Sequence, residues 1–463
     1  MGSSLSVREK ISKLAAERIL VLDGAMGSLL SKMAPGVEGY NDLLCLSRPD
    51  IVSAIHEAYL EAGADIIETS SFNAASIMLE DRSLAGKTYG ISRRSAELGR
   101  KAADKFTSPE KPRFVAGSLG PTAKSASIAQ GMNELSKRAV TWDELEAAYY
   151  ENARGLLDGG ADLIVIETIF DTLNAKAAIF AVERLANERG IDVPLIISAT
   201  LTENGRLLSG QTVEAFCVSV QHAHPFALGL NCSFGAEKLK AHVATVSAIA
   251  PCLVIAYPNA GFPNNQGVYE ESPESMALQI NEYLKEGLVN IVGGCCGSTP
   301  PHISAISEVV KNHAPRSLPL LPEKNLLSGL EVFEPCKKDM VNKPANKNAA
   351  NSREFTELIK KSEYDDALEM LCENTEEGYT LVCLEADPSV KETDITGFIN
   401  FALQYPDVAR RPMMLESSSW AFIEAGLKCL QGRSLVNYTG PKGEDADSRR
   451  RSNLVISYGA VLR

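Results

Sequence analysis

Eight short apolar runs rich in β-branched residues recur between positions 19 and 297, and each ends in small or polar residues. They read ILVLDGAMG, ADIIETSSF, RFVAGSLGP, ADLIVIETI, PLIISATL, ALGLNCS, LVIAYPNAG and VNIVGGCCG. The segments between them repeat apolar residues at steps of three and four and mostly end near glycine, as in PDIVSAIHEAYLEAG and TWDELEAAYYENARGLLDGG, which predicts helices. Strand and helix therefore alternate eight times.

The predicted strands are continuously apolar, which indicates a parallel sheet covered on both faces. Eight such units predict a closed (β/α)8 barrel, an α/β fold of the TIM-barrel type, with an open doubly wound sheet as the alternative. In a barrel, the residues that end the strands gather at one mouth. Enzymes with this fold place their chemistry there.

Charge and hydropathy narrow the classes of partner. The formal net charge of −13 argues against nucleic acid and against an anionic membrane surface, since both attract clustered lysine and arginine. The N-terminus lacks the pattern of a signal peptide, and no run of 18 apolar residues occurs. These features predict a cytoplasmic protein that acts on small molecules or other proteins. Its ten cysteines are then reduced thiols.

Three of these thiols end predicted strands. Cys232 ends the sixth run, and Cys295 and Cys296 end the eighth. Adjacent strand residues point to opposite faces, so two vicinal thiols reach one metal only if the backbone leaves strand geometry, which Gly293, Gly294 and Gly297 permit. Three thiolates with one open position suit catalytic zinc. The alternative is that the thiols are buried apolar groups.

Eight motifs, in chain order, resemble the homocysteine S-methyltransferase family. They are LDGAMGSLL, ETSSFNAASI, GSLGPTAKSASI, IETIFDTLNAK, SGQTVEAF, GLNCSFGAEKL, YPNAGFPN and GGCCGSTPPHI. Within that family they are most similar to the N-terminal homocysteine-binding module of cobalamin-dependent methionine synthase. The resemblance runs over roughly residues 10–320 and implies transfer of a methyl group to homocysteine to give methionine.

The resemblance also implies how the reaction is supported. Cys232, Cys295 and Cys296 would hold zinc, the homocysteine sulfur would take the open position, and Asn259 would be a temporary fourth ligand. The implied methyl donor is methylcobalamin on a separate corrinoid protein. An S-methylmethionine or betaine-type donor is the alternative, and a scaffold or regulatory subunit without catalysis is the alternative outside enzymes.

An amino acid substrate needs partners for both of its charged ends. Asp23 and Glu167, which end the first and fourth predicted strands, are the predicted partners of the ammonium group, and Glu68 is a further acid at a strand end. Backbone N–H groups at Gly24 and Ala25 lie in a glycine-flanked turn suited to a carboxylate. The other predicted substrate contacts are Ser118, which shapes the pocket floor, Asn231 and Asn259.

The composition changes after the barrel motifs. We predict a barrel over residues 1–314, a linker rich in Pro, Lys and Asn over 315–352, and a truncated half-barrel over 353–463 that resembles a folate-binding domain. Its pterin motifs are altered to VNKPANKNAANS and LVCLEADPSV. A half-barrel leaves sheet edges that need cover. The first barrel, a partner protein or a second copy of the chain would supply it.

Overall fold

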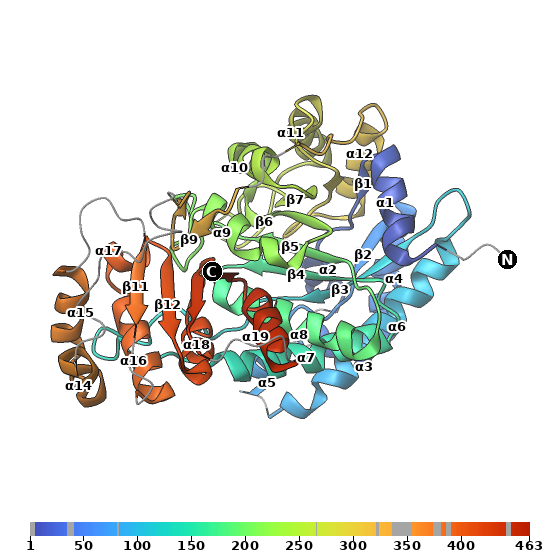
Figure 1. The fold of residues 1–463 in the computed structure, drawn as a ribbon. Coiled ribbons are helices and arrows are strands. Elements are labelled where there is room, and N and C mark those ends of the chain that lie inside the picture. Colours follow the sequence, from blue (N-terminus) through green and yellow to red (C-terminus); the bar gives the residue numbers. More distant parts are fainter. Residues whose placement is uncertain are drawn as a thin grey trace.

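The computed structural model describes residues 5–34, 41–80, 83–264, 266–320, 324–335, 353–373, 381–385, 390–440 and 446–463. Eight parallel strands form one sheet in the order β1-β8-β7-β6-β5-β4-β3-β2. Leu22 bridges to Ile66 in parallel, so the first strand also meets the second and the sheet closes. The predicted (β/α)8 barrel is confirmed, and the open doubly wound sheet is excluded (Figure 1).

Each predicted strand run overlaps one observed strand. The strands are β1 (Leu20–Val21), β2 (Ile66–Glu68), β3 (Phe114–Leu119), β4 (Leu163–Ile169), β5 (Leu195–Ala199), β6 (Ala227–Gly235), β7 (Leu253–Asn259) and β8 (Ile291–Val292). The helices of this part are α1 (Val7–Glu17), α2 (Met26–Met33), α3 (Leu44–Ser47), α4 (Pro49–Glu61), α5 (Ser76–Leu79), α6 (Thr88–Phe106), α7 (Trp142–Asp158), α8 (Thr172–Arg189), α9 (Val213–Val220), α10 (Ala236–Ile249), α11 (Pro273–Lys285) and α12 (Pro300–Val310).

Local sequence explains where the main helices start and stop. Thr141 and Glu144 form a reciprocal capping box at the start of α7, which satisfies backbone N–H groups that have no partner within the helix. Asp171 caps α8, and Gly190 ends it with a φ of 62°, a conformation that glycine adopts without steric cost.

The strands alternate between two apolar layers. Leu20, Ile66, Leu163 and Val165 belong to the cluster that fills the barrel. Val21, Ile67, Ile164 and Ile166 belong to the cluster between the sheet and the helices. Since both faces of each strand are buried, the unbroken apolar runs of the sequence have a direct structural reason.

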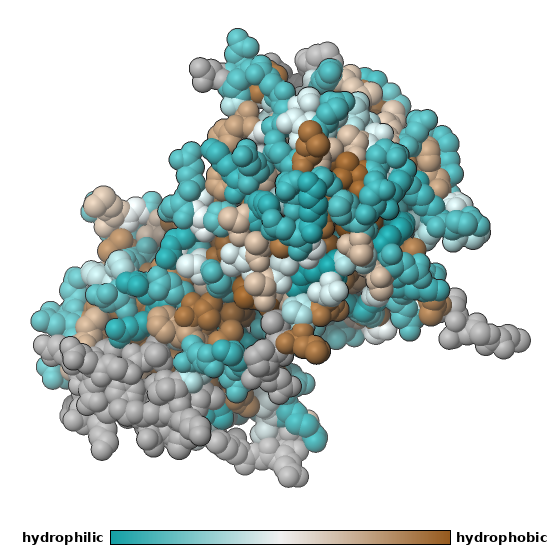
Figure 2. All heavy atoms as spheres, turned by 90° about the horizontal axis from the view of Figure 1, so that it is seen from above, coloured by the Kyte–Doolittle hydropathy of each residue, from teal (hydrophilic) through white to brown (hydrophobic). Residues whose placement is uncertain are grey.

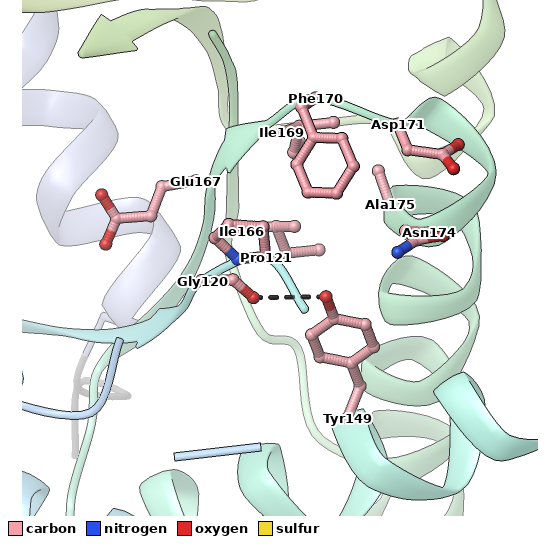
Figure 3. Close-up of a pocket in the computed structure, with 10 residues that line it drawn as sticks. All are labelled: Gly120, Pro121, Tyr149, Ile166, Glu167, Ile169, Phe170, Asp171, Asn174 and Ala175. Atoms are coloured by element: carbon pink, nitrogen blue, oxygen red, sulfur yellow. Dashed lines mark hydrogen bonds between the residues drawn. The ribbon is translucent and has the colours of Figure 1, made fainter. Parts of the chain in front are cut away.

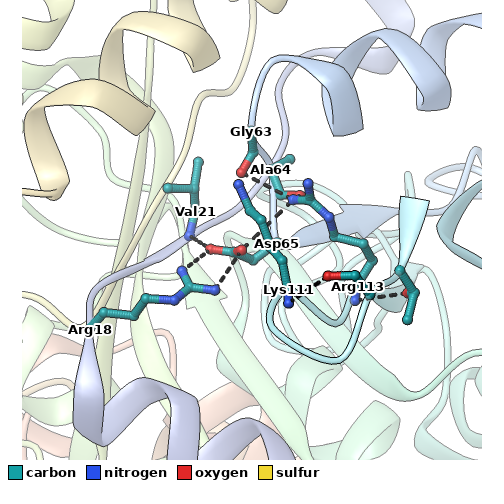
Figure 4. A network of polar contacts seen from close by, with 9 residues as sticks. Arg18, Val21, Gly63, Ala64, Asp65, Lys111 and Arg113 are labelled. Carbon is teal, nitrogen blue, oxygen red and sulfur yellow. Dashed lines mark hydrogen bonds and ion pairs between the residues drawn. The ribbon is translucent and has the colours of Figure 1, made fainter.

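A buried carboxylate joins the first two strands at the end of the barrel opposite the mouth (Figure 4). Arg18 donates two hydrogen bonds to Asp65, at 2.7 and 2.9 Å, and the backbone N–H of Val21 donates a third at 3.0 Å. Arg113 lies 3.8 Å from the same carboxylate. Asp65 is 1% exposed. This network stabilises the contact between β1 and β2 that closes the barrel.

Asp65→Asn is expected to lower the free energy of unfolding by about 1.5–3 kcal/mol, the range for hydrogen bonds to a charged group. The change keeps the size of the side chain but leaves two arginines without their counter-charge. Urea unfolding measures the effect. Asp192→Asn is the control, because Asp192 pairs with Arg8 on the surface, where such pairs contribute less than about 1 kcal/mol. Equal losses in both variants would contradict this role of Asp65.

The C-terminal residues form a second parallel sheet, in the order β11-β12-β13-β14, which confirms a partial βα unit after the barrel. The strands are β11 (Val382–Glu385), β12 (Met413–Ser417), β13 (Leu435–Tyr438) and β14 (Val461–Leu462). The helices are α14 (Arg353–Lys361), α15 (Tyr364–Glu373), α16 (Glu392–Ala402), α17 (Pro406–Ala409), α18 (Trp420–Leu427) and α19 (Ala446–Ser457).

The predicted linker is described only in part. Within it, β9 (Leu327–Ser328) and β10 (Val332–Phe333) form an antiparallel pair. Residues 336–352, which include the altered motif VNKPANKNAANS, lie outside the described residues, as do residues 386–389 of the second altered motif. The bounds of these three regions stay a prediction.

The C-terminal sheet rests against one side of the barrel (Figure 1). Lys176 of α8 is completely buried, and its Nζ donates to the carbonyl oxygens of Leu430 and Gly432 at 2.9 Å each. Tyr458 stacks on Phe180 of α8 with ring centroids 5.0 Å apart. The barrel therefore supplies cover for the C-terminal sheet.

Further contacts join the C-terminal residues to loops at the barrel mouth. Arg138, in the loop after β3, donates to the carbonyl of Asn400 at 2.6 Å. Gln431 donates to the carbonyl of Ser209, in the loop after β5, at 3.3 Å. Arg206 of the same loop pairs with Glu331 at 3.1 Å. These contacts lie at the carboxyl ends of β3 and β5.

The face of the molecule seen in Figure 2 carries mainly polar residues. In Figure 2, hydrophilic residues cover most of the visible face and hydrophobic residues lie in patches between them. None of the helices in the described ranges combines the length and the apolar character needed to span a bilayer.

Candidate active site

A polar layer lies above the apolar filling of the barrel. Ile66, Ala116 and Val165 point into the barrel, and Glu68, Ser118 and Glu167 each lie two positions later in the same strand. Because side chains alternate along a strand, these three also point inward. Ser198 of β5 likewise lies two positions after the inward Ile196. The carboxyl ends of the strands therefore present hydroxyl and carboxyl groups where the layers below present only hydrocarbon.

The three thiols predicted to share a metal lie together at this mouth. The sulfur atoms of Cys232, Cys295 and Cys296 all lie within 4.8 Å of one another. Those of Cys232 and Cys296 are 3.6 Å apart, much longer than a disulfide bond. Sulfur ligands about 2.3 Å from one tetrahedral ion would be separated by about 3.8 Å. The spacing therefore fits a shared metal ion.

The backbone leaves strand geometry at both thiol segments. Cys232 has a φ of 63°, in the left-handed region that non-glycine residues rarely adopt, and the pairing of β6 with β7 shifts between Asn231 and Gly235. On the other side, β8 ends at Val292, before the vicinal pair. Gly297 has a φ of 81°, and a Cβ there would lie 2.3 Å from Tyr269.

Gly293 and Gly294 also lie in close contact with neighbouring residues. A Cβ on Gly293 would approach Leu22 to 2.7 Å, and one on Gly294 would approach Ser298 Oγ to 2.4 Å. Close packing, and not a left-handed conformation, therefore requires these two glycines.

The thiols influence one another electrostatically. Hydrogen bonds from Cys232 and then Cys295 lower the pKa of Cys296, and burial opposes this shift. Hydrogen bonds to Cys232 and then Cys296, followed by burial, raise the pKa of Cys295 well above its usual range. Tyr269 also hydrogen-bonds to Cys296 and lowers its pKa further. One thiolate in the cluster is thus stabilised by donors around it, as expected for a site that holds negatively charged sulfur.

Three acidic side chains converge beside the thiols. Burial, followed by the nearby Glu167 carboxyl, raises the pKa of Asp23 and of Glu68 well above their usual ranges. Burial also raises the pKa of Glu167 to about 7, although a hydrogen bond from Ser118 at 2.5 Å opposes it. Asp23 Oδ1 and Glu68 Oε1 have no hydrogen-bond partner among the described residues. Unpartnered buried carboxyl oxygens of this kind suit a cationic ligand.

The turn after β1 is held by side chains from distant segments. Ser298 Oγ accepts from the N–H of Ala25 at 3.1 Å, and Tyr59 donates to the carbonyl of Ala25 at 3.1 Å. A Cβ on Gly24 would lie 2.7 Å from Ser298 Oγ. Because Ser298 occupies the N–H of Ala25, a substrate carboxylate would find its donors at the neighbouring residues and at the start of α2.

Asn259 and Asn231 differ in whether their side-chain oxygens have hydrogen-bond partners. Asn259 donates through Nδ2 to the carbonyl of Cys232, and its Oδ1 is buried without a partner among the described residues. This free oxygen fits a fourth ligand to a metal held by the thiols. Asn231 is fully buried. Its Oδ1 accepts from Thr168 and Ser198, and its Nδ2 donates to Thr168 Oγ1 and, at 4.0 Å, to the sulfur of Cys295.

A small cavity lies on the helix side of β4 (Figure 3). It is lined by Gly120, Pro121, Tyr149, Ile166, Glu167, Ile169, Phe170, Asp171, Asn174 and Ala175. In Figure 3 the carboxyl group of Glu167 points to the other side of the strand, away from Ile169 and Tyr149. Glu167 therefore belongs to the barrel mouth, and this cavity is not the substrate site.

Sequence reasoning missed Tyr59, Ser298 and Tyr269. Tyr59 lies in α4, where its spacing gives only the pattern of a core residue. Tyr269 lies in the loop after β7. Ser298 is the one with a sequence signal, because it follows the glycine-flanked pair of cysteines directly.

Together these features define a (β/α)8 barrel of the enzyme type, with a candidate metal site of three thiols and a candidate cation site of three buried carboxyl groups at its mouth. A family model described as homocysteine S-methyltransferase matches residues 20–310. The chain belongs to this family, whose reaction is methyl transfer to homocysteine.

Solved structures support the fold. The metallated form of the homocysteine methyltransferase MmuM from Escherichia coli is 24% identical, with a TM-score of 0.52 and coverage of 64% of this chain and 98% of that chain. The oxidized form of the same protein is also 24% identical, with a TM-score of 0.52 and coverage of 66% and 99%.

Proposed function

We propose that this protein transfers a methyl group to the sulfur of homocysteine to give methionine, with zinc held by Cys232, Cys295 and Cys296. The observation that carries the proposal is the group of three sulfur atoms within 4.8 Å of one another, beside buried carboxyl oxygens that lack partners. When bound, zinc would keep a thiol in its deprotonated, nucleophilic form at neutral pH.

The chain's own residues orient the substrate. Asp23, Glu68 and Glu167 bind the ammonium group, whose positive charge would offset the cost of burying these acids. Ser118 holds the carboxyl group of Glu167 through its hydroxyl hydrogen bond. The turn at Gly24 receives the carboxylate. These contacts fix the amino acid end so that the sulfur is directed toward the thiol cluster.

The methyl donor is proposed from the sequence motifs alone. Their similarity to the homocysteine module of methionine synthase favours a methylated corrinoid carried by a separate protein, and S-methylmethionine or a betaine is the alternative. The test is to incubate zinc-loaded protein with homocysteine and each donor, free methylcobalamin included, and to measure methionine. No methionine with any donor, together with no binding of homocysteine, would favour the scaffold alternative.

Glu167→Gln is expected to weaken homocysteine binding by about 1.5–3 kcal/mol, because it replaces a charge-assisted hydrogen bond with a neutral one. The zinc content should stay the same. Calorimetry with homocysteine measures the affinity. Glu183→Gln is the control, since Glu183 is a largely buried acid of α8 whose pKa burial also raises to about 7. Unchanged affinity in Glu167→Gln would remove Glu167 from the site.

A further inference from the structure

Thr168 adopts a strained backbone conformation beside Glu167. Its φ is 53° within β4, where an extended backbone is the rule. A β-branched residue rarely enters this left-handed region, and it stays there only when its surroundings hold it. Two questions follow: which residue holds Thr168 in this conformation, and why β4 requires the conformation.

The reason lies in the pairing of β4 with β5. Ile166 pairs with Ile197 and Ile169 pairs with Ala199, so two residues of β4, Glu167 and Thr168, stand opposite one residue of β5. This is a β-bulge. Ile166 and Ile169 both belong to the apolar layer under the helices, whereas the carboxyl group of Glu167 points the opposite way (Figure 3).

A regular strand would place residues 167 and 169 on one face. An unbulged β4 would then either carry Ile169 into the polar mouth or turn Glu167 toward the helices. The extra residue allows the isoleucine and the acid to face opposite sides. The direction of the Glu167 side chain thus depends on the left-handed conformation of Thr168.

Asn231 of β6 is the partner that fixes Thr168. Its Oδ1 accepts from the backbone N–H of Thr168 at 3.0 Å, and its Nδ2 donates to Thr168 Oγ1 at 2.8 Å. Ser198 donates to the same Oδ1 at 2.7 Å. With two donors, the amide oxygen has no lone pair left for a substrate, and the side chain is fully buried.

We propose that Asn231 is a positioning residue, which holds Thr168 in the left-handed conformation and thereby aims Glu167 at the ammonium group of the substrate. This inference rests on the proposed function. It replaces the direct substrate contact that the sequence suggested for Asn231.

A double-mutant cycle tests the inference. Homocysteine binding to zinc-loaded protein is measured by calorimetry for wild type, Asn231→Ala, Glu167→Gln and the double variant. Asn231→Ala alone is expected to weaken binding about 10-fold or more, the scale of losing the Glu167 contact. In the Glu167→Gln background the same change should add less than about 3-fold, because residues that act through one contact are not additive.

Glycine at position 168 supplies a rescue experiment. It adopts the left-handed conformation without steric cost, so Thr168→Gly combined with Asn231→Ala should recover most of the affinity lost in Asn231→Ala. A role of Asn231 in general stability would not be rescued in this way. Asn290→Ala is the control, since Asn290 is a buried amide that bridges Val254 and Arg316. Its affinity for homocysteine should equal that of wild type.

The outcomes distinguish failure of the positioning role from failure of the proposed function. Suppose that wild type binds homocysteine. If the losses of affinity then multiply in the double variant, or if glycine at position 168 does not rescue Asn231→Ala, the positioning role alone is overturned. Loss of zinc in Asn231→Ala would do the same, because it would assign Asn231 to the thiol cluster. Zinc-loaded wild type that fails to bind homocysteine would overturn the proposed function and the positioning role together.

Discussion

Replacing Cys232, Cys295 or Cys296 by alanine is expected to reduce zinc from about one atom per chain to near zero and to abolish methionine formation. Each change removes one of three charged ligands from the proposed site. Loss of an outer partner of a metal ligand costs about 10- to 100-fold in affinity or activity, so loss of a ligand itself should cost more. Metal analysis of protein kept under reducing conditions measures the first effect, and the methionine assay measures the second.

The fold should survive these changes. The three thiols lie partly exposed at strand ends, so their removal leaves little cavity in the core. Cys252→Ala is the matched control, because Cys252 is a partly exposed thiol that precedes β7, at the other end of the barrel. It should keep both zinc and activity. Zinc that is retained in all three thiol variants would contradict the site, and global unfolding of all three would assign the thiols to the core.

Lys176→Met is expected to lower the free energy of unfolding by about 2–6 kcal/mol. The substitution fills a similar volume but leaves the buried carbonyl oxygens of Leu430 and Gly432 without the Nζ donor that both now share. A buried acceptor without a partner costs about 1–3 kcal/mol. Urea unfolding measures the loss. Lys428→Met is the control, because Lys428 pairs across the same interface with the exposed Asp143 and should contribute less than about 1 kcal/mol.

The same lysine predicts a dependence on pH. Burial, followed by the positive charge of Arg433, lowers the pKa of Lys176 to about 7 in the folded protein, whereas a lysine in the unfolded chain titrates at about 10.4. Between these values the unfolded state holds a proton that the folded state lacks, so the stability of wild type should rise with pH relative to Lys176→Met. A difference that stays constant from pH 7 to 10 would contradict this assignment.

Much of the fold could be predicted from the sequence because parallel strands buried on both faces leave long apolar runs. The thiols could be predicted to meet because the carboxyl ends of barrel strands share one mouth. The bulge at Thr168 could not be predicted, since VIETI has the sequence of an uninterrupted strand and the left-handed conformation depends on Asn231, 63 positions away. Cys232 is a similar case, because its conformation accompanies a shift in pairing between β6 and β7.

Lys176 shows a second limit of sequence reasoning. A lysine in an amphipathic helix is normally solvated, and nothing in α8 itself distinguishes this one. Its burial comes from a C-terminal segment more than 250 positions away, so only the packed structure shows it. For Glu68, the position at a strand end could be predicted from the sequence. Its electrostatic interaction with Asp23 and Glu167 could not.

The contacts of Arg138, Arg206 and Ser209 with the C-terminal part make the entrance to the barrel unequal around its circumference. The loops after β3 and β5 contact the C-terminal part, whereas Cys232 lies in the last part of β6 and the other two thiols follow β8. A small methyl donor would diffuse in from any open direction. Since β5 is the neighbour of β6, the contact after β5 lies beside the segment that carries Cys232, whereas β7 and β8 lie on the other side of that segment. The C-terminal part therefore bounds the rim on the β3 to β5 side of the thiol cluster, and these contacts do not reach its β7 and β8 side.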